Sequence, residues 1–173
     1  MALRGEYLGM ALELDDSDAI QREYFRACAA GELRLQCCDA CRLLRYPPTT
    51  ACPFCAEAAS TWTAVPGRGT VYSYGEVHHA ILPAFRKHTP YQVLLVELDE
   101  QRGRPGEHDG LRVIGNLVTP EGALAPPELV RRVGIGSRVR MIFSPAGGEI
   151  AIPNWTLDES APQPKAPWRY PQE

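Results

Sequence analysis

Two short cysteine pairs constrain this chain more than any other feature of its sequence. Cys38 and Cys41 form one CxxC pair, Cys52 and Cys55 form a second, and ten residues separate the pairs. Each pair makes a tight turn that directs two thiolates at one point, and two such turns complete a tetrahedral set that suits zinc. We therefore predict a structural zinc site at these four cysteines, with no open coordination position for catalysis.

Other interpretations of the cysteines stay open. Iron in a rubredoxin-like site uses the same four ligands, whereas a dithiol redox centre needs only two of them. Cys37 could replace Cys38 as first ligand, although Cys38 repeats the spacing of the second pair. We expect Cys28 to be a small apolar residue on a helix rather than a ligand.

The segment 1–32 is predicted to end in a helix that docks on this chain or on a partner. Acidic and hydroxyl side chains at 15–18 supply capping oxygens where a helix begins. Apolar residues then recur at helical spacing from Ile20 to Cys28, and Gly31 is a natural stop.

Five β-type runs follow the cysteine segment, each bounded by glycine, proline or charged turns. In the fourth run Val139 and Met141 alternate with Arg138 and Arg140, which is typical of a strand with one buried face. The five runs are Thr70–Val77, Tyr91–Leu98, Leu111–Val118, Ser137–Phe143 and Glu149–Ile152.

A short helix is predicted between the third and fourth runs, because Pro127 and Glu128 suit a helix start and Gly134 suits its end. Five strands with a helix at this place are the pattern of an OB-fold barrel, whereas five strands are few for a β-sandwich. We expect a mainly β chain made of an N-terminal segment with a docking helix (1–32), a zinc ribbon (33–64), an OB-fold barrel (65–157) and a Pro-rich tail (158–173).

Two segments outside these runs are predicted as loops. The charged stretch Glu97–Gly110 is expected to be a solvated hairpin tip. The tail after Asp158 is Pro-rich and cannot form a core of its own, so a free end is expected. The alternative is a tail that wraps a neighbouring subunit, since Trp168 and Tyr170 are costly to leave in water.

Charge and hydropathy restrict the partners of the chain. With 18 Lys+Arg against 21 Asp+Glu, the net charge of −3 argues against binding nucleic acid through bulk positive charge. No apolar run approaches the roughly 18 residues that a membrane helix needs. The first residues carry Glu6 and Glu13 and lack the apolar stretch of a signal peptide, so a cytoplasmic protein is expected.

The order of these motifs resembles a known family. A helix, two cysteine turns joined by RYPPTTACPFC, and the series GTVYSY, PAF and PYQVLLVELD are similar to the acyl-CoA-associated proteins once catalogued as domain of unknown function 35. The resemblance covers about Ser17 to Trp155 and implies a rubredoxin-like zinc ribbon followed by an OB-fold. The loop Glu97–Gly110 is longer than usual in that family, and the tail is extra.

The resemblance also implies a function. Members are non-catalytic subunits that bind and stabilise a thiolase-family enzyme, such as an aldolase or ketoacyl-CoA thiolase, and help shape its acyl-CoA site. Two copies of each chain are expected in the complex, with a CoA thioester as shared substrate and with no nucleic acid or membrane partner. A hydratase-type partner is the alternative within the family.

The loop Ala80–Pro90 is where OB-folds commonly bind ligands and partners. Arg86 and Lys87 could meet CoA phosphates, and Phe85 could pack against the pantetheine arm or the partner, although an ordinary solvated basic tip would show the same residues. We find no Ser/His/Asp or Cys/His signature and no carboxylate at a recognisable spacing from the histidine pair, so no catalytic residue is predicted. The candidate acyl-CoA or partner contacts are His78, His79, Phe85, Arg86, Lys87 and Tyr91.

Two rival functions come from other classes of protein. Tyr72 and Tyr74 are predicted on one side of the first barrel strand, where they could stack nucleic-acid bases with charge from Arg112, Arg138 and Arg140. The net acidity and the absence of a clustered basic run count against that function. A free-standing enzyme acting on acyl-CoA would need a nucleophile or an open metal position, and neither is recognisable.

Overall fold

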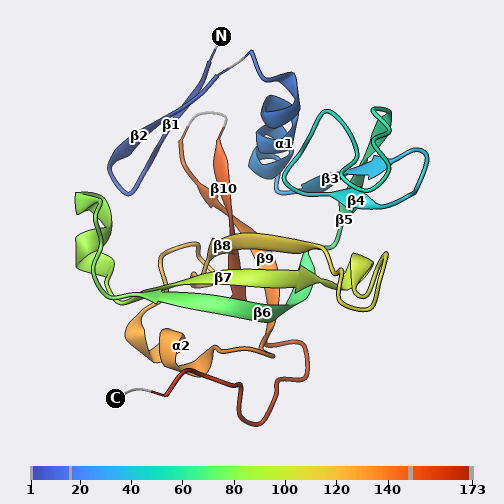
Figure 1. The fold of residues 1–173 in the computed structure, drawn as a ribbon. Coiled ribbons are helices and arrows are strands. Elements are labelled where there is room, and N and C mark those ends of the chain that lie inside the picture. Colours follow the sequence, from blue (N-terminus) through green and yellow to red (C-terminus); the bar gives the residue numbers. More distant parts are fainter. Residues whose placement is uncertain (1, 16, 148–149, 172–173) are drawn as a thin grey trace.

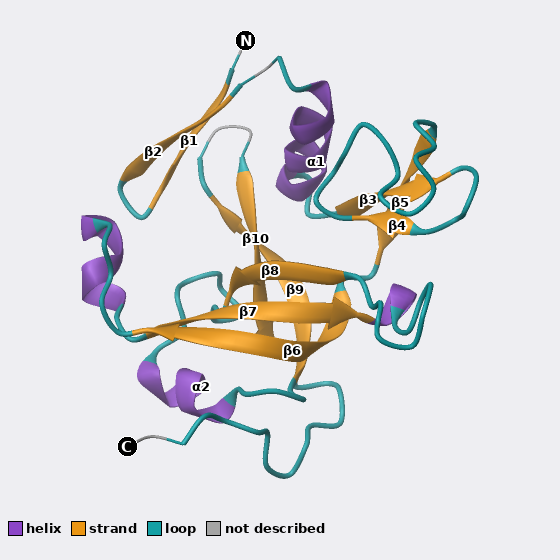
Figure 2. Ribbon diagram, in the orientation of Figure 1, coloured by secondary structure: helices purple, strands orange, loops and turns teal. Residues whose placement is uncertain are grey.

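The fold is a strand-rich barrel that carries a small ribbon and a hairpin on one side (Figure 1). The computed structural model describes residues 2–15, 17–147 and 150–171. The helices are short and lie around the strands (Figure 2). No helix in this described part is long and apolar enough to span a bilayer.

The chain begins with a β-hairpin that the sequence did not predict. Strands β1 (Leu3–Tyr7) and β2 (Met10–Leu14) pair antiparallel. Leu8 and Gly9 join them with φ of 53° and 80°, the two-residue turn whose twist matches a hairpin. The usual Asn-Gly sequence of such a turn is missing here. Leu8 occupies the first turn position, although leucine rarely adopts a positive φ. The prediction of a helix alone in segment 1–32 was therefore incomplete.

The predicted helix is present as α1 (Ala19–Ala29). The Asp18 carboxylate accepts hydrogen bonds from the backbone N–H groups of Ile20 and Gln21, both at 3.0 Å, which confirms the expected cap. Tyr24 and Cys28 are buried on the face that packs into the core.

The cysteine segment forms a three-stranded antiparallel sheet in the order β4-β3-β5. Its strands are β3 (Leu33–Cys38), β4 (Leu44–Arg45) and β5 (Ser60–Val65). The first CxxC pair lies at the β3–β4 turn, and the second lies in the connection from β4 to β5.

The barrel contains five strands in the order β10-β9-β6-β7-β8. A parallel bridge between Leu117, just beyond β8, and Trp155 of β10 brings the two edges together. Helix α2 (Pro127–Arg132) lies between β8 and β9, so the predicted OB-fold connectivity is confirmed. The strands are β6 (Arg68–Val77), β7 (Tyr91–Leu98), β8 (Arg112–Asn116), β9 (Arg138–Pro145) and β10 (Ala151–Leu157).

The last strand differs from its predicted bounds. The expected run was Glu149–Ile152, whereas β10 runs from Ala151 to Leu157, and Glu149 lies outside the described residues. The predicted run ends just before Pro153, and proline cannot donate to a central ladder. In the structure β10 is an edge of the five-stranded sheet, where a missing N–H is tolerated.

A bulge in β6 separates two tyrosines that were predicted to share a face. The β6–β7 register shifts between Val71 and Ser73, which leaves Tyr72 as an extra residue. Tyr72 is 50% exposed, whereas Tyr74 is 9% exposed and belongs to the core. The prediction that the two tyrosines lie on one side of the strand was therefore wrong.

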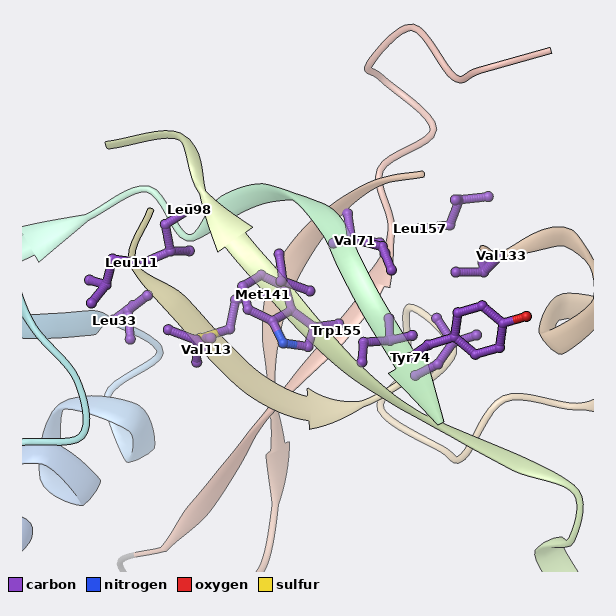
Figure 3. Close-up of a cluster of buried hydrophobic side chains, with 14 of the residues drawn as sticks. Leu33, Val71, Tyr74, Leu98, Leu111, Val113, Val133, Met141, Trp155 and Leu157 are labelled. Carbon is purple, nitrogen blue, oxygen red and sulfur yellow. The ribbon is translucent and has the colours of Figure 1, made fainter. Parts of the chain in front are cut away.

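The ribbon and the barrel share one hydrophobic core. Figure 3 shows Leu33 of the ribbon in the same buried cluster as Val113 and Trp155 of the barrel. Trp155 is fully buried, and Tyr24 and Cys28 of α1 belong to the same cluster. Because these side chains form one cluster, we expect the two parts to stabilise each other.

The loop Glu97–Gly110 is anchored to the ribbon, which corrects the expectation of a wholly solvated tip. It starts with a 3₁₀ helix, Asp99–Gln101, whose last residue is 2% exposed. The Gln101 Oε1 accepts the Leu44 backbone N–H at 2.6 Å, and its Nε2 donates to the Leu44 carbonyl at 3.3 Å. Asp99 is exposed, and so are the residues from Arg102 to Asp109, apart from two partly covered glycines.

The tail packs on its own barrel as far as Pro171, so this part is not a free end. Trp168 and Ile135 exchange backbone hydrogen bonds of 2.9 and 3.1 Å. The Arg169 guanidinium donates to the carbonyls of Val130 and Val133 and forms an ion pair with Glu76. The rings of Trp168 and Tyr170 stay about half exposed, and contact with a neighbouring subunit stays a prediction.

Candidate metal centre and contact surface

The four predicted ligands come together at the end of the ribbon. The Sγ atoms of Cys38 and Cys55 lie 3.6 Å apart, and those of Cys41 and Cys52 lie 3.5 Å apart. All four sulfur atoms lie within 4.8 Å of one another. A zinc–sulfur bond of 2.3 Å in a tetrahedron places the sulfurs about 3.8 Å apart. The donor set therefore fits a four-coordinate zinc ion with little adjustment.

The backbone makes the two CxxC turns alike. Arg42 and Ala56, each four residues after the first cysteine of its pair, both adopt a φ of 62°. Their N–H groups donate to the carbonyls of Cys38 and Cys52 at 3.0 and 2.9 Å. The backbone N–H of Cys41 lowers the pKa of Cys38 to about 6, and the thiolate is the form that binds metal.

Cys37 lies outside the four-sulfur cluster. Its Sγ is directed toward the carbonyl oxygens of Arg42 and Cys38, at 3.7 and 3.9 Å. The alternation of β3 places neighbouring side chains on opposite faces, so Cys37 joins the hydrophobic core while Cys38 faces the other thiolates.

Sequence reasoning missed a buried arginine in the ribbon. Arg45 is fully buried and donates to the carbonyls of Thr49, Glu57 and Ala59 at 3.3, 3.1 and 3.0 Å. These bonds tie together the residues that flank the second CxxC pair. Zinc with four thiolates carries two negative charges, and Arg45 supplies a buried positive charge in the same ribbon. No spacing pattern in the sequence marks such a role.

The loop Ala80–Pro90 contains a 3₁₀ helix, Pro83–His88, and packs against aromatic rings of this chain. Phe85 packs against Tyr91 and Tyr7, with ring centroids 5.2 and 6.3 Å apart. Phe85 and Tyr91 are therefore partly covered by this chain itself, and Phe85 holds the loop in place.

The exposed side chains of this loop are apolar and basic. Ile81 is 87% exposed and Leu82 is 53% exposed, and sequence reasoning missed both. Arg86 and Lys87 are exposed and form no ion pair with any described residue. The sequence did contain a signal for this exposed apolar surface, because two adjacent aliphatic residues directly precede Pro83 in a predicted loop. We call these four side chains the loop surface.

Both histidines lie just beyond the end of β6. His78 Nε2 lies 3.1 Å from a carboxylate oxygen of Glu76, and the other oxygen lies 2.8 Å from Arg169 Nη2. Sequence reasoning recognised no carboxylate near the histidines and missed Glu76, which lies two residues before His78. His79 is exposed.

The loop Ala80–Pro90 and the ribbon lie at opposite ends of β6 (Figure 1). β6 begins at Arg68, just after the ribbon, and ends at Val77, just before the loop. A metal at the thiolates is therefore placed to stabilise the ribbon and not to contact a ligand at the loop.

Two of the three arginines expected beside the tyrosines are engaged within the chain. Arg112 stacks over the Tyr72 ring, with its guanidinium carbon 3.7 Å from the centroid, and Arg138 forms an ion pair with Asp99. With Tyr74 buried as well, this surface lacks the open aromatic pair that base stacking requires.

A four-thiolate ribbon followed by a five-stranded barrel with this connectivity defines the class of zinc-ribbon and OB-fold proteins. Residues 25–60 match the family model described as ChsH2, rubredoxin-like zinc ribbon domain, and residues 62–144 match ChsH2, C-terminal OB-fold domain. The chain belongs to the ChsH2 family, which confirms the resemblance drawn from the sequence.

Two relatives extend this comparison. A solved structure described as an Ltp2-ChsH2(DUF35) aldolase is 31% identical, covers 83% of this chain and 98% of that chain, and has a TM-score of 0.63. A protein of Thermomonospora curvata named probable enoyl-CoA hydratase alpha subunit is 36% identical over 138 residues, 78% of this chain. The present chain spans 37% of the length of that curated relative.

Proposed function

We propose that this chain is a non-catalytic subunit that binds a thiolase-family enzyme, an aldolase or a ketoacyl-CoA thiolase, and helps shape its acyl-CoA site. The observation that carries this proposal is the match to nearly the whole length of a chain of the Ltp2-ChsH2(DUF35) aldolase. A match over 98% of that chain means that the shared part is the subunit itself and not a fragment of it.

The metal centre supports a structural role. Four protein thiolates saturate zinc, so the ion contributes folding free energy and offers no position to a substrate. The reaction chemistry would then come from side chains of the partner enzyme.

The loop surface is the candidate contact region. Ile81 and Leu82 expose aliphatic area that a partner would cover, and burying such side chains contributes roughly 1.5–3 kcal/mol each. Arg86 and Lys87 are free of ion pairs with described residues and suit the phosphates of CoA. Packing of Phe85 against Tyr91 and Tyr7 holds the loop in one conformation, which reduces the conformational entropy lost when the loop binds a partner or ligand.

Co-purification tests the partner. A tagged chain is recovered from its native cells at moderate salt, and the bound proteins are identified and quantified by mass spectrometry. We expect a thiolase-like protein at equal amounts, in an assembly of two copies of each chain. Recovery of nucleic acid in place of a protein, or of the chain alone, would contradict the proposal.

The loop surface is tested by kinetics of the reconstituted complex. The double variant Arg86→Ala and Lys87→Ala should raise the KM for acyl-CoA about tenfold, because charge-assisted hydrogen bonds to phosphate are lost. Arg104→Ala, in the exposed part of the loop Glu97–Gly110, is the matched control and should leave KM unchanged. An unchanged KM in the double variant would remove both residues from the proposal.

A hydratase-type complex is the second candidate. The observation that favours it is the name of the curated relative, probable enoyl-CoA hydratase alpha subunit. The same co-purification distinguishes the two candidates, because a hydratase-type protein would then be the one recovered at equal amounts.

A further inference from the structure

A cavity of about 520 Å³ lies at the end of the barrel that the loop surface does not occupy. It opens between α2, the end of β10 and the start of β6. Its size falls within the range of small-molecule sites in proteins. Its lining includes Arg68, Leu129, Arg132, Arg140, Leu157 and Asp158.

Two arginines face each other in the wall of this cavity. Arg68 of β6 and Arg140 of β9 are direct cross-strand partners, so their side chains lie on the same face of the sheet. Like charges placed directly opposite each other destabilise a sheet unless anions compensate them. The arrangement therefore calls for two negative charges close by.

The chain supplies one of these charges. The Asp158 side chain is 2% exposed, and its Oδ2 lies 3.1 Å from Arg68 Nη1. The Ser160 hydroxyl donates to its Oδ1 at 2.6 Å. Hydrogen bonding to Ser160, with the nearby charges of Arg68 and Arg140, lowers the pKa of Asp158 and keeps it ionised at neutral pH.

Arg140 is left without a direct anionic partner. It is partly buried, and within the described residues it forms neither a side-chain hydrogen bond nor an ion pair. At the rim, Arg132 already pairs with Glu159 at 3.4 Å. Three carboxylates, those of Glu128, Asp158 and Glu159, also line the cavity, and among the described residues Arg140 is the lining arginine that makes no direct ion pair.

The opposite wall is apolar. Leu129 and Pro126 of the α2 region and Leu157 of β10 contribute hydrocarbon surface to the lining. An occupant that satisfies both walls has one negative charge and an aliphatic body. We propose that this cavity binds a small aliphatic monocarboxylate, with its carboxylate on Arg140 and its chain against Leu129 and Leu157.

This site is distinct from the proposed acyl-CoA contacts. Arg68 is the first residue of β6, whereas the loop Ala80–Pro90 follows its last residue. The inference therefore does not depend on the loop surface or on the identity of the partner enzyme.

Binding of octanoate to the zinc-loaded full chain tests the proposal by isothermal titration calorimetry. We expect saturable binding with a one-to-one ratio. Arg140→Gln should weaken it at least about tenfold, because a charge-assisted hydrogen bond is lost. Arg104→Gln is the matched control: Arg104 is exposed in the loop Glu97–Gly110 and does not line the cavity, so octanoate binding to this variant should match the wild type.

Two further probes separate charge from hydrocarbon contact. Inorganic phosphate and 1-octanol should each bind more weakly than octanoate, since each engages only one wall. Leu129→Asn should weaken octanoate binding even if Arg140→Gln proves unstable. Zinc content and thermal unfolding report whether each variant is folded.

The following results would overturn the proposal. Octanoate fails to bind saturably, or Arg140→Gln and Arg104→Gln bind it equally well, or phosphate binds as tightly as octanoate. Loss of partner binding in Arg140→Gln, with no octanoate binding to the free chain, would assign Arg140 to a carboxylate of the partner instead.

Discussion

At the scale of single residues, two adjacent thiols serve different purposes. Cys38 faces Cys55 at 3.6 Å between sulfur atoms, whereas Cys37 contacts backbone carbonyls and the core. We expect Cys38→Ser to lose zinc and Cys37→Ser to retain one zinc ion per chain, measured by elemental analysis after dialysis. The opposite result would assign Cys37 as the ligand.

The remaining thiol, Cys28, should be chemically inert in the folded chain. Burial raises its pKa from the usual 9.0 to about 12, so the neutral form dominates at mildly alkaline pH. A raised pKa stabilises the fold below pH 9 and loses that contribution as the pH rises toward 12. Iodoacetamide should therefore alkylate Cys28 only after unfolding, as mass spectrometry of the peptides would show. Rapid labelling of Cys28 in the zinc-loaded native protein would contradict this expectation.

Residues with a strict spacing could be predicted from the sequence, and residues whose partners are backbone groups could not. The four ligands follow from two CxxC pairs because the spacing itself encodes the turn. Arg45 and Gln101 act on carbonyl and amide groups that are 4 to 57 residues away, and no pattern of side chains records such contacts.

At the scale of elements, the loop Glu97–Gly110 connects the barrel to the ribbon. Gln101→Leu removes both hydrogen bonds to the Leu44 backbone and leaves that amide and carbonyl buried. The free energy of unfolding should fall by about 1–3 kcal/mol, measured by urea titration of the zinc-loaded protein. Hydrogen exchange of the Leu44 amide should become faster.

A control for this prediction lies in the same loop. Glu107 is exposed at the tip, so Glu107→Gln should change neither the unfolding free energy nor the exchange rate. Equal behaviour of Gln101→Leu and Glu107→Gln would mean that the loop does not anchor the ribbon.

Elements with regular alternation were predictable, whereas local irregularities were not. β9 alternates Val139 and Met141 with two arginines, and the structure has it as expected. The bulge at Tyr72 and the turn at Leu8 depend on single backbone conformations that leave the hydrophobic pattern unchanged. The paired tyrosines and the missing hairpin are therefore two of the places where pattern reasoning failed.

At the scale of the whole molecule, the core that the ribbon and the barrel share predicts that zinc removal affects the barrel. The variant Trp62→Phe, Trp168→Phe retains Trp155 as its one tryptophan, fully buried in the barrel. When a chelator removes zinc, Trp155 emission should shift to longer wavelength as the metal is released, because loss of the ribbon opens the shared cluster. Unshifted Trp155 emission after complete zinc release would show that the barrel is stable alone.

The shared core also has a consequence for the living cell. A chain whose barrel closes only when its ribbon has acquired metal stays exposed to proteases until that moment. Cellular zinc supply would then set how many copies survive synthesis. Metal starvation would thereby limit whatever pathway depends on this protein, even though the ion never meets a substrate.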